Sequence, residues 1–445
     1  MDFRCDLHNH TMYSNVRLID ALSTPKALID RAIELGLKGI AITDHEVLSA
    51  HPKANRYAEE IKEKNPDFKV ILGNEIYLVD ERPADKHYHY ILLSKNKKGH
   101  RQLRELSSLA WLNNYQRNGT RVDTLKEDLE RIIKKDPGNL IASTACIGGE
   151  LGSCILELTA AEKINDTATI QRVYNKIIDF ILWNKDLFKD DFYLEVQPGV
   201  SKEQIIVNKR IALIAKAFNI KMICTSDSHY LSKEDRYVHK AFLNSHQEER
   251  EVDSFYQDAY LHSNEEMITK FTLSDFDESF VKNMFKNTME IYDKIENYSL
   301  AHNQTIPKVD VPEYPKETRQ EIINKIAKDY PTLAALMTSD DKIERYWYQE
   351  CTQKLIELNK NTKEYWERLE EEAKTKKIIS EKLGTNIFAY PITLKHYIDK
   401  FWECGSTVGA GRGSSCSGLN HYLLGVTQLD PIQWELPFWR LGILK

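Results

Sequence analysis

Residue types that bind metal ions recur along the first 230 residues of this 445-residue chain. They are His8, His10, Asp44, His45, Glu75, His87, His89, Cys146, Asp227 and His229. Neutral imidazole, carboxylate and thiolate groups are the ligands that zinc, manganese and iron take in proteins. Bridging carboxylates can hold several ions ~3.5–4 Å apart, which suits phosphate ester hydrolysis because one ion activates water while another stabilises the leaving oxygen.

Two pairs among these candidates have the spacing of joint ligands. Residues i and i+2 of an extended chain face the same side, so His8 with His10 can bind one ion together. The same holds for Asp227 with His229. A lone pair of this kind is more often a surface or core pair, but recurrence after several strands favours a metal cluster.

Each remaining candidate has a simpler explanation when it is taken alone. Cys146 suits a small core position, and Asp44-His45 suits a helix cap beside a core histidine. His87 and His89 face the same side, so either can be the ligand at that point. Histidines without such a context are expected on the surface, namely His51, His100, His239, His246, His262, His302 and His396.

Alternating strands and helices must position these side chains. Ser23-Thr24-Pro25 and Gly36 delimit one predicted helix, and Ser201 with Gln204 forms a capping box before another. Alternation predicts a parallel sheet, as a barrel or doubly wound, with function at the carboxyl ends of the strands. The predicted strands are 3–7, 39–43, 70–72, 90–93, 140–143, 192–196 and 222–225.

Composition limits the class of protein. The net charge of −6 argues against a generally basic protein that coats nucleic acid. The seven cysteines are scattered without a CxxC pair, and the charged start lacks a secretory signal. No apolar run approaches the ~18 residues of a membrane span. We therefore expect a protein of the reducing cytoplasm, without a membrane anchor.

A second chemical signal lies near the other end of the chain. Residues 408–415 read Val-Gly-Ala-Gly-Arg-Gly-Ser-Ser, and the backbone NH groups of such a loop can approach phosphate oxygens closely. The loop lacks the lysine of a P-loop, which argues against an ATPase. Between the two signals, Asp275-Phe276-Asp277 is expected in a surface turn or helix cap, and 365–381 as an amphipathic helix.

Taken together, the motifs resemble a known family. The chain is similar to the polymerase and histidinol phosphatase (PHP) domain that opens the alpha subunit of bacterial DNA polymerase III, a family C replicative polymerase. The order and spacing of the motifs agree with that family. The motifs are Asp6-Leu-His8-Asn-His10-Thr11, Gly39-Ile-Ala-Ile-Thr43-Asp44-His45, Gly73-Asn-Glu75, Ser143-Thr-Ala-Cys146-Ile-Gly-Gly-Glu150, Thr225-Ser-Asp227-Ser-His229-Tyr230 and the glycine loop.

The resemblance implies a distorted (βα)7 PHP barrel that binds up to three zinc, manganese or iron ions. The family places an acid shortly after the first histidine pair, which assigns Asp20 across an insertion at 15–17. His89 is preferred over His87 because it directly precedes the apolar run that leads to Ser94. The implied ligands are His8, His10, Asp20, His45, Glu75, His89, Cys146, Asp227 and His229.

The glycine loop resembles the Gly-x-Gly-Arg-Gly-Ser loop of the family C palm. By that resemblance, the triphosphate of an incoming nucleotide would contact Gly411, Arg412, Gly413 and Ser414. The aspartates that bind Mg²⁺ in the complete polymerase should follow this loop, and the chain stops before them. We therefore expect an incomplete palm and no complete nucleotidyl transfer on this chain alone. The expected domains are a PHP metal-binding barrel over 1–250, a helical connector over 251–340 and the N-terminal portion of the palm over 341–445.

The predicted function follows from both signals. The chain is interpreted as the N-terminal part of a DNA-directed DNA polymerase, a nucleotidyltransferase of DNA replication. Its metal site is expected to carry 3′–5′ exonuclease or phosphoesterase activity, with no catalytic residue assigned beyond the metal cluster. The expected partners are DNA and dNTP in the complete enzyme, a C-terminal polymerase fragment and other replisome subunits. The alternatives are a stand-alone metallo-phosphoesterase for a small phosphate ester and a non-catalytic scaffold stabilised by metal.

Overall fold

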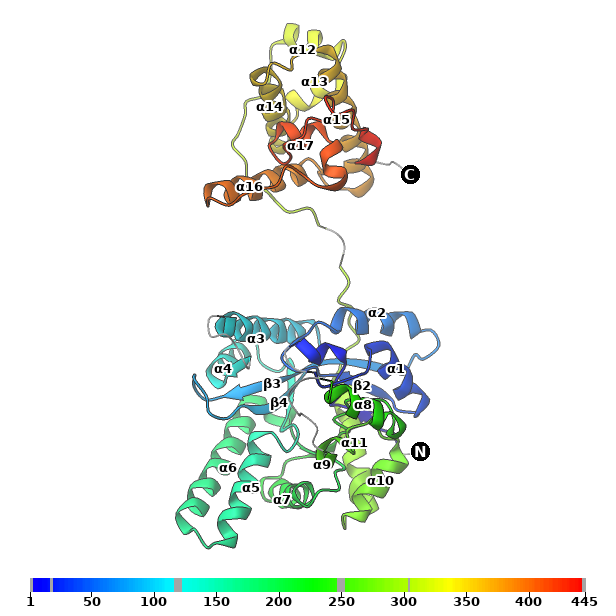
Figure 1. Ribbon diagram of the computed structural model, residues 1–445, viewed down its shortest axis with the longest axis vertical. Helices are drawn as coiled ribbons and strands as arrows, with labels where there is room; N and C mark the ends of the chain where they lie inside the picture. Colours follow the sequence, from blue (N-terminus) through cyan, green and yellow to red (C-terminus); the bar gives the residue numbers. More distant parts are fainter. Residues whose placement is uncertain (1–2, 17–18, 116–121, 246–252, 303–304, 442–445) are drawn as a thin grey trace. The chain divides into compact units, whose positions relative to one another are not determined.

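The chain folds into two compact units, Met1–His302 and Asn303–Lys445 (Figure 1). The computed structural model describes residues 3–16, 19–115, 122–245, 253–302 and 305–441. The expected connector over 251–340 is divided between the two units. Its first helices belong to the barrel unit because Met267, Phe271 and Phe285 enter the barrel's main core. Its later helices contribute to a separate core in the second unit.

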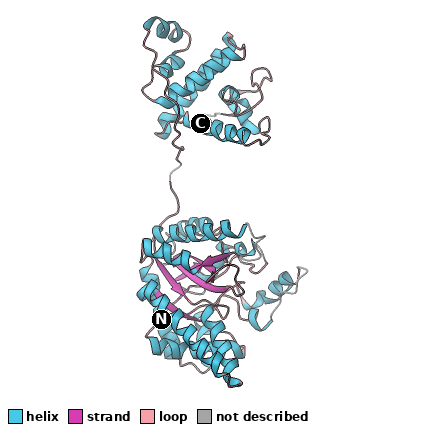
Figure 2. Ribbon diagram, turned by 90° about the vertical axis from the view of Figure 1, so that its left-hand side faces the viewer, coloured by secondary structure: helices cyan, strands magenta, loops and turns pink. Residues whose placement is uncertain are grey.

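The first unit is built around a curved sheet (Figure 2), in which seven strands overlap the predicted apolar runs and one short strand, Asp123–Leu125, was not predicted. The sheet order is β1-β2-β3-β4-β6-β7-β8, and the short β5 pairs with β3 beside this path. The strands are β1 (Cys5–Asp6), β2 (Gly39–Ile42), β3 (Lys69–Val79), β4 (Tyr88–Ser94), β5 (Asp123–Leu125), β6 (Leu140–Ser143), β7 (Phe192–Val196) and β8 (Met222–Cys224).

The first and last strands of this path approach each other. Directly after β1 and β8, Asn9 and Ser228 form a parallel bridge, and the His10 backbone NH donates to the Ser228 carbonyl at 2.8 Å. The sheet is therefore a nearly closed barrel with seven strands along its path. The predicted distorted (βα)7 barrel, followed by a helical region, is confirmed.

One strand differs in direction from the parallel sheet that alternation predicts. β4 runs antiparallel to both β3 and β6. Residues 80–87, between β3 and β4, contain no helix, whereas a parallel return needs a crossover of a dozen or more residues. Because the connection is short, β4 runs in the opposite direction to its neighbours. Its first residues, rather than its last, therefore lie at the edge of the sheet where the parallel strands end.

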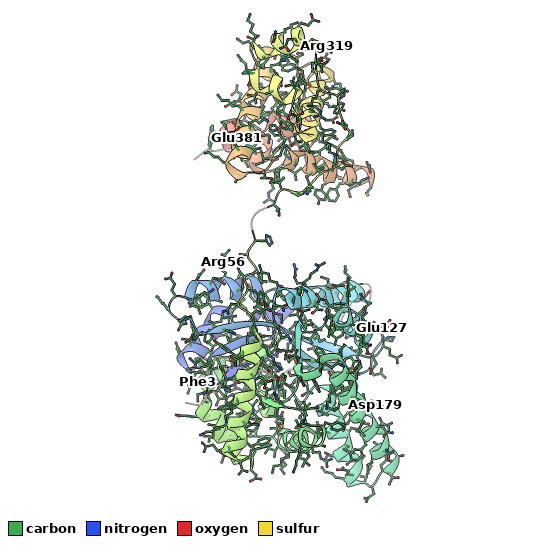
Figure 3. The ribbon with its side chains drawn as sticks, turned by 180° about the vertical axis from the view of Figure 1, so that it is seen from behind. Phe3, Arg56, Glu127, Asp179, Arg319 and Glu381 are labelled. Carbon is green, nitrogen blue, oxygen red and sulfur yellow. The ribbon has the colours of Figure 1, made fainter. Side chains whose placement is uncertain are left out.

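Helices cover the outside of the barrel (Figures 1 and 2). Charged side chains such as Arg56, Glu127 and Asp179 extend from their outer faces into solvent (Figure 3). The helices are α1 (Pro25–Glu34), α2 (His51–Ile61), α3 (Lys97–Tyr115), α4 (Lys126–Lys135), α5 (Glu150–Lys163), α6 (Thr167–Phe188), α7 (Lys202–Phe218), α8 (Arg236–Leu243), α9 (Asp253–Tyr256), α10 (Asn264–Leu273) and α11 (Glu278–Lys294).

Local chemistry explains where the two predicted helices begin. The Thr24 side chain accepts a hydrogen bond from the Ala27 backbone NH at the start of α1, and Pro25 occupies the first turn. The Ser201 side chain accepts from the Gln204 backbone NH at the start of α7. Both predicted starts are confirmed.

Inward-facing side chains fill the lower part of the barrel. Leu7, Ala41, Ile71, Ile141 and Ile223 come from five different strands or their immediate continuations and form one apolar cluster. The end of α11 contributes to the same cluster. Because this plug is apolar, the polar candidates can gather only at the opposite end, where the parallel strands finish.

In its described residues, the second unit has helices but no strand. Its core contains Trp347, Leu355, Leu369 and Phe388, all fully buried. The helices are α12 (Gln320–Ala327), α13 (Pro331–Met337), α14 (Lys342–Glu357), α15 (Lys363–Leu383), α16 (Ala389–Glu403) and α17 (Leu419–Leu423). Among the described residues of the whole chain, no helix is both long and apolar enough to cross a membrane.

Candidate metal centre

The first histidine pair lies at the centre of the polar cluster. His8 and His10 are fully buried, and their Nε2 atoms lie 3.1 Å apart. The Glu75 carboxylate lies 3.3 Å from His8 and 3.0 Å from His10. The Asp227 carboxylate lies 3.2 Å from both. Four side chains from three segments of the chain thus direct ligand atoms at one point.

The other predicted ligands extend this cluster in two directions. On one side, Asp20 Oδ2 lies 2.9 Å from His45 Nε2 and 3.2 Å from His229 Nε2. On the other, His89 Nδ1 lies 2.7 Å from Glu75 Oε1 and 3.3 Å from Cys146 Sγ. All nine residues expected from the sequence are therefore brought together; that they bind metal stays a prediction.

Three groups within the cluster have the compactness of a metal site. In each group, one ligand atom per residue lies within 4.8 Å of the others. Glu75 contacts members of all three groups through its two oxygens, and His10 is shared by two of them. The groups are His10, His45 and His229; His8, His10 and Asp227; and Glu75, His89 and Cys146.

The cluster has the chemistry of a cation site that lacks hydrogen-bond donors. His45 Nδ1, Glu75 Oε1 and Asp227 Oδ1 are buried and lie 2.7–3.2 Å from other atoms of the cluster, but none makes a well-directed hydrogen bond among the described residues. The pKa of Cys146 is raised well above its usual value by burial and by the charges of Asp227 and Glu75. A bound cation would reverse that effect and satisfy the lone pairs. The residues present therefore fit divalent metal ions.

The carboxylates of the cluster are ionised despite their burial. Burial alone would raise the pKa of Glu75, but His89, His45 and His8 together hold it well below its usual value. His229 and His45 hold the pKa of Asp20 low in the same way. Anionic oxygens at these points favour a metal cation over an apolar or anionic ligand.

Two residues in the loops around the cluster, Asp227 and Ala145, have unusual backbone conformations. Asp227 has a φ of 47°, and Ala145, next to Cys146, has a φ of 57°. Residues other than glycine rarely adopt this left-handed backbone conformation, so the surrounding packing must stabilise it. Such conformations are concentrated at functional sites, which agrees with a chemical role for these two loops.

In the second unit, the glycine loop lies on the surface. Gly411, Arg412, Gly413 and Ser414 are all exposed. Gly411 has a φ of 135°, and a Cβ there would approach Cys416 Sγ to 2.8 Å. The loop is held from behind, because the Gln428 backbone NH donates to the Ala410 carbonyl at 2.7 Å. The nucleotide role of this loop stays a prediction.

Comparison with known proteins agrees with the family that the metal-ligand motifs and the glycine loop suggest. Residues 6–199 match the PHP domain, and residues 341–441 match the bacterial DNA polymerase III alpha NTPase domain. The probable DNA polymerase YorL of Bacillus subtilis (strain 168) is 40% identical over 97% of this chain. The DNA polymerase III subunit alpha of Aquifex aeolicus is 29% identical over 98% of it.

The chain carries a PHP domain and a DNA polymerase III alpha domain. The resemblance inferred from the motifs is confirmed. The chain spans only 35% of the length of the Bacillus protein and 34% of the Aquifex protein, so it corresponds to one part of such a polymerase.

A solved structure also aligns with 51% of the chain. The putative metal-dependent phosphoesterase from Bifidobacterium adolescentis covers 51% of this chain, with 87% of its own length aligned. The sequence identity is 18% and the TM-score 0.32, which is too low to support any argument about function.

The PHP domain places His89, rather than His87, in the cluster. His87 precedes β4, and its Nδ1 lies 2.6 Å from Asp123 Oδ1. His89 is inside the strand, directly opposite Tyr77 of β3. Because β4 is antiparallel, its first residues are at the edge where the parallel strands end, and His89 faces the interior there.

One functional residue of the PHP domain was absent from the expected ligand set. Glu195, in β7, is fully buried and lies 2.7 Å from His8 Nδ1, on the far side of the imidazole from the cluster. It also accepts hydrogen bonds from Ser143 and Thr225. A partner of this kind fixes the tautomer and orientation of a ligating histidine. A charged residue inside the apolar run 192–196 was the signal in the sequence.

Asp44 has a supporting role as well. Its Oδ1 accepts hydrogen bonds from the Thr11 backbone NH at 2.6 Å and from the Ser14 hydroxyl at 2.8 Å. The Ser14 oxygen lies 3.1 Å from His10 Nδ1. Asp44 thus orients His10 through Ser14 and does not face the centre itself.

Four histidines expected on the surface are buried instead. His51, His100, His239 and His262 are between 0% and 6% exposed. His51 Nε2 lies 2.8 Å from the Gly73 carbonyl and its Nδ1 3.1 Å from His100 Nε2, while His239 Nε2 lies 2.6 Å from the Asp20 carbonyl. Backbone carbonyls and helices from distant segments cover these rings, which local sequence context does not reveal. His302 is exposed, His396 is half-buried, and His246 lies outside the described residues.

Proposed function

We propose that the PHP domain binds divalent metal ions at its nine-residue cluster and hydrolyses phosphodiester bonds, as a 3′–5′ exonuclease within a replicative DNA polymerase. The observation that carries this proposal is the convergence of nine ligand-type side chains, of which eight form three compact groups and the ninth, Asp20, contacts two of their histidines. Zinc, manganese and iron are the candidate ions, because imidazole, carboxylate and thiolate ligands are mixed. Bound ions would supply an activated water and stabilise charge on the leaving oxygen.

The protein's own residues prepare this centre before any ion arrives. Glu195 and Ser14 orient the two central histidines from behind. Glu75 contacts histidines on both sides, so its carboxylate is the natural bridge between groups. The apolar plug below the cluster keeps water out of the barrel interior, which strengthens every electrostatic interaction above it.

The test combines metal content with hydrolysis of single-stranded DNA that has a free 3′ end. We expect purified protein reconstituted with manganese to release mononucleotides from that end. His8→Ala and Asp227→Asn should both lower bound metal and hydrolysis, because each removes a ligand from the central group. Hydrolysis that persists undiminished in both variants would contradict the proposal.

Two histidines of one segment offer a matched pair for the same assay. His89→Ala removes a group that contacts Glu75 and Cys146, whereas His87→Ala removes one that contacts Asp123. We expect only the first to reduce metal binding. Bound metal without hydrolysis of DNA or of a small phosphate ester would instead support the non-catalytic scaffold. Turnover of the small ester alone would support the stand-alone phosphoesterase.

For the second unit, we propose that Gly411, Arg412, Gly413 and Ser414 contact the triphosphate of a dNTP in the complete polymerase. The match of residues 341–441 to a DNA polymerase III alpha domain supports this role. The exposure of all four residues leaves their backbone NH groups accessible to a ligand. Mg²⁺ and its aspartate ligands would come from the remaining part of the polymerase.

The cellular setting follows from the same proposal. The partners would be DNA, a fragment that supplies the rest of the polymerase, and other replisome subunits in the cytoplasm. Named DNA polymerases among the relatives support this setting. Copurification of a polymerase fragment with the tagged chain from its host would test it.

A further inference from the structure

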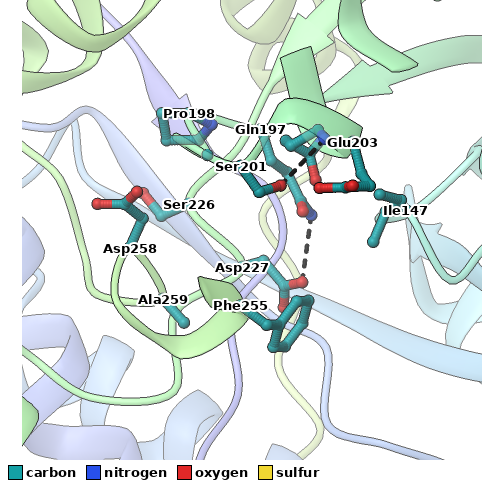
Figure 4. Close-up of a pocket in the computed structure, with 12 residues that line it drawn as sticks. Ile147, Gln197, Pro198, Ser201, Glu203, Ser226, Asp227, Phe255, Asp258 and Ala259 are labelled. Atoms are coloured by element: carbon teal, nitrogen blue, oxygen red, sulfur yellow. Dashed lines mark hydrogen bonds between the residues drawn. The ribbon is translucent and has the colours of Figure 1, made fainter. Parts of the chain in front are cut away.

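A cavity of about 250 Å³ lies directly beside the metal cluster. It is formed by the loop after β7, the start of α7, the loop after β8 and the segment around α9 (Figure 4). Asp227 belongs both to this cavity and to the central ligand group. A molecule bound here would therefore reach the cluster at its Asp227 end.

Gln197 joins the cavity to the cluster. Its side-chain amide donates to Asp227 Oδ2 at 3.2 Å (Figure 4) and to Glu195 Oε1 at 3.3 Å. Glu195 in turn holds His8. The wall of the cavity is thus fixed to the same residues that orient the ligands.

The charged groups of the lining exclude phosphate from the cavity itself. Asp227, Glu203 and Asp258 are all part of the lining, and the lining residues include no lysine or arginine. Asp258 is 9% exposed, its Oδ1 pairs with Lys270, and its Oδ2 has no hydrogen-bond partner among the described residues. An acceptor-rich lining of this kind suits a neutral group that donates hydrogen bonds, such as an exocyclic amine or a sugar hydroxyl.

The apolar part of the lining offers a surface for an aromatic ring. Phe255 is half-buried, and Ile147, Pro198 and Ala259 supply further apolar contacts. A base stacked on an aromatic side chain is a common, sequence-tolerant mode of nucleic-acid binding. The volume is below the about 300–1,000 Å³ of sites for drug-sized ligands, so one nucleoside is a better match than a longer segment.

We propose that this cavity binds the terminal nucleoside of a DNA 3′ end, with its base against Phe255 and its phosphate outside the cavity, beyond Asp227 at the ligand cluster. The inference rests on the proposed phosphodiesterase function and adds the residues that select the substrate. In this arrangement Phe255 and Asp258 would contact the nucleoside and select the substrate. Neither belongs to the nine-residue cluster, so they would not bind metal. A terminal nucleotide would then be favoured over small phosphate esters that lack a base.

The first experiment needs no metal and no turnover. Saturation-transfer NMR with 2′-deoxyadenosine, in the presence of EDTA, should show transfer to the base protons in the wild-type chain. Phe255→Ala should weaken this binding by about fivefold or more, on the scale of one base–aromatic stack, while Phe255→Tyr should retain it. Tyr237→Ala is the matched aromatic control, because Tyr237 is 76% exposed on α8 and outside the cavity. Equal transfer in the wild type and Phe255→Ala would overturn the proposal.

The second experiment separates this proposal from the function on which it rests. With manganese bound, Phe255→Ala and Asp258→Asn should raise the KM for 3′-ended DNA several-fold more than the KM for glycerol 2-phosphate, a phosphate ester with neither base nor ring. Hydrolysis of both substrates with no effect of either variant would sink the nucleoside site and leave the phosphoesterase intact. Nucleoside binding without any hydrolysis would support the cavity and contradict the exonuclease.

Discussion

The two candidate sites of this chain are organised in opposite ways. The ligand cluster of the PHP domain is enclosed, with His8, His10 and Glu75 no more than 1% exposed. The glycine loop of the second unit is open, with Gly411 through Ser414 all exposed. The first site gathers residues 219 positions apart in sequence at the bridge between Asn9 and Ser228. The second site is one continuous segment.

This difference shows which site is self-sufficient. A cluster whose every ligand is supplied and oriented by the same barrel is preorganised for binding. An exposed loop that offers backbone NH groups on one side needs further groups to enclose a ligand. We therefore expect the PHP domain to bind its ligands within this chain, and the loop to require another part of a polymerase.

The largest expected effect tests whether the two sites are independent. Glu75→Gln should weaken metal binding by more than about 100-fold, the upper end for residues that merely support a ligand, since Glu75 contacts four histidines. Gly411→Ala should leave metal affinity unchanged while it distorts the glycine loop, because its Cβ would strike Cys416. Competition with a chromogenic chelator measures both. Weaker metal binding by Gly411→Ala would contradict the independence of the two sites.

The next effect concerns Glu372, a buried carboxylate that binds the backbone of the segment directly after the glycine loop. Glu372 of α15 is fully buried and accepts hydrogen bonds from the Leu419 and Asn420 backbone NH groups at 2.6 and 2.9 Å. Glu372→Ala should lower the free energy of unfolding of the second unit by about 3 kcal/mol, because it leaves these donors unpaired. Urea unfolding, followed by tryptophan fluorescence, measures the loss. Glu371→Ala, at the exposed neighbouring position, is the control and should change little.

Acid should destabilise the second unit through one histidine. Burial and the nearby Lys376 lower the pKa of His421 to about 4, from 6.5, against the opposing effect of the Ser415 carbonyl. Below pH 6.5 the unfolded chain takes up a proton that the folded unit refuses, so stability falls as the pH drops towards 4. The loss should approach about 3 kcal/mol near pH 4.

The same urea titrations at several pH values measure this loss. His421→Gln should remove that portion of the pH dependence, whatever its effect at neutral pH. An unchanged slope between pH 6.5 and 4 in the variant would show that other groups are responsible.

The smallest effect concerns the two acids that the sequence predicts in a surface turn or helix cap. Asp275 is exposed in the turn before α11, and Asp277 occupies the N-cap of that helix. Asp275→Asn should leave DNA hydrolysis within about twofold and stability within about 0.5 kcal/mol, because exposed ion pairs such as Lys209–Asp275 contribute little. A large loss of hydrolysis in this variant would place chemistry outside the barrel cluster.

Local patterns predicted much of the PHP domain. The start of α1 at Pro25, the start of α7 at Lys202 and the positions of seven strands depend on nearby residues and agree with the structure, although β3 continues to Val79 and β5 was not predicted. The ligand set came from motif resemblance, and its nine members converge. The supporting role of Glu195 was not predicted, because it depends on β7 lying beside the segment of His8.

The sequence by itself determined the ligand types, the order of the strands and the relation to DNA polymerase III alpha proteins. Only the tertiary structure decided that β4 runs antiparallel to its neighbours, that His51 and His239 are buried, and that the glycine loop is exposed. The physical reason is that spacing and capping act within a few residues, whereas burial depends on which distant segments cover a side chain. The direction of β4 depends on both, since a short connection reversed the strand and thereby brought His89 to the ligand cluster.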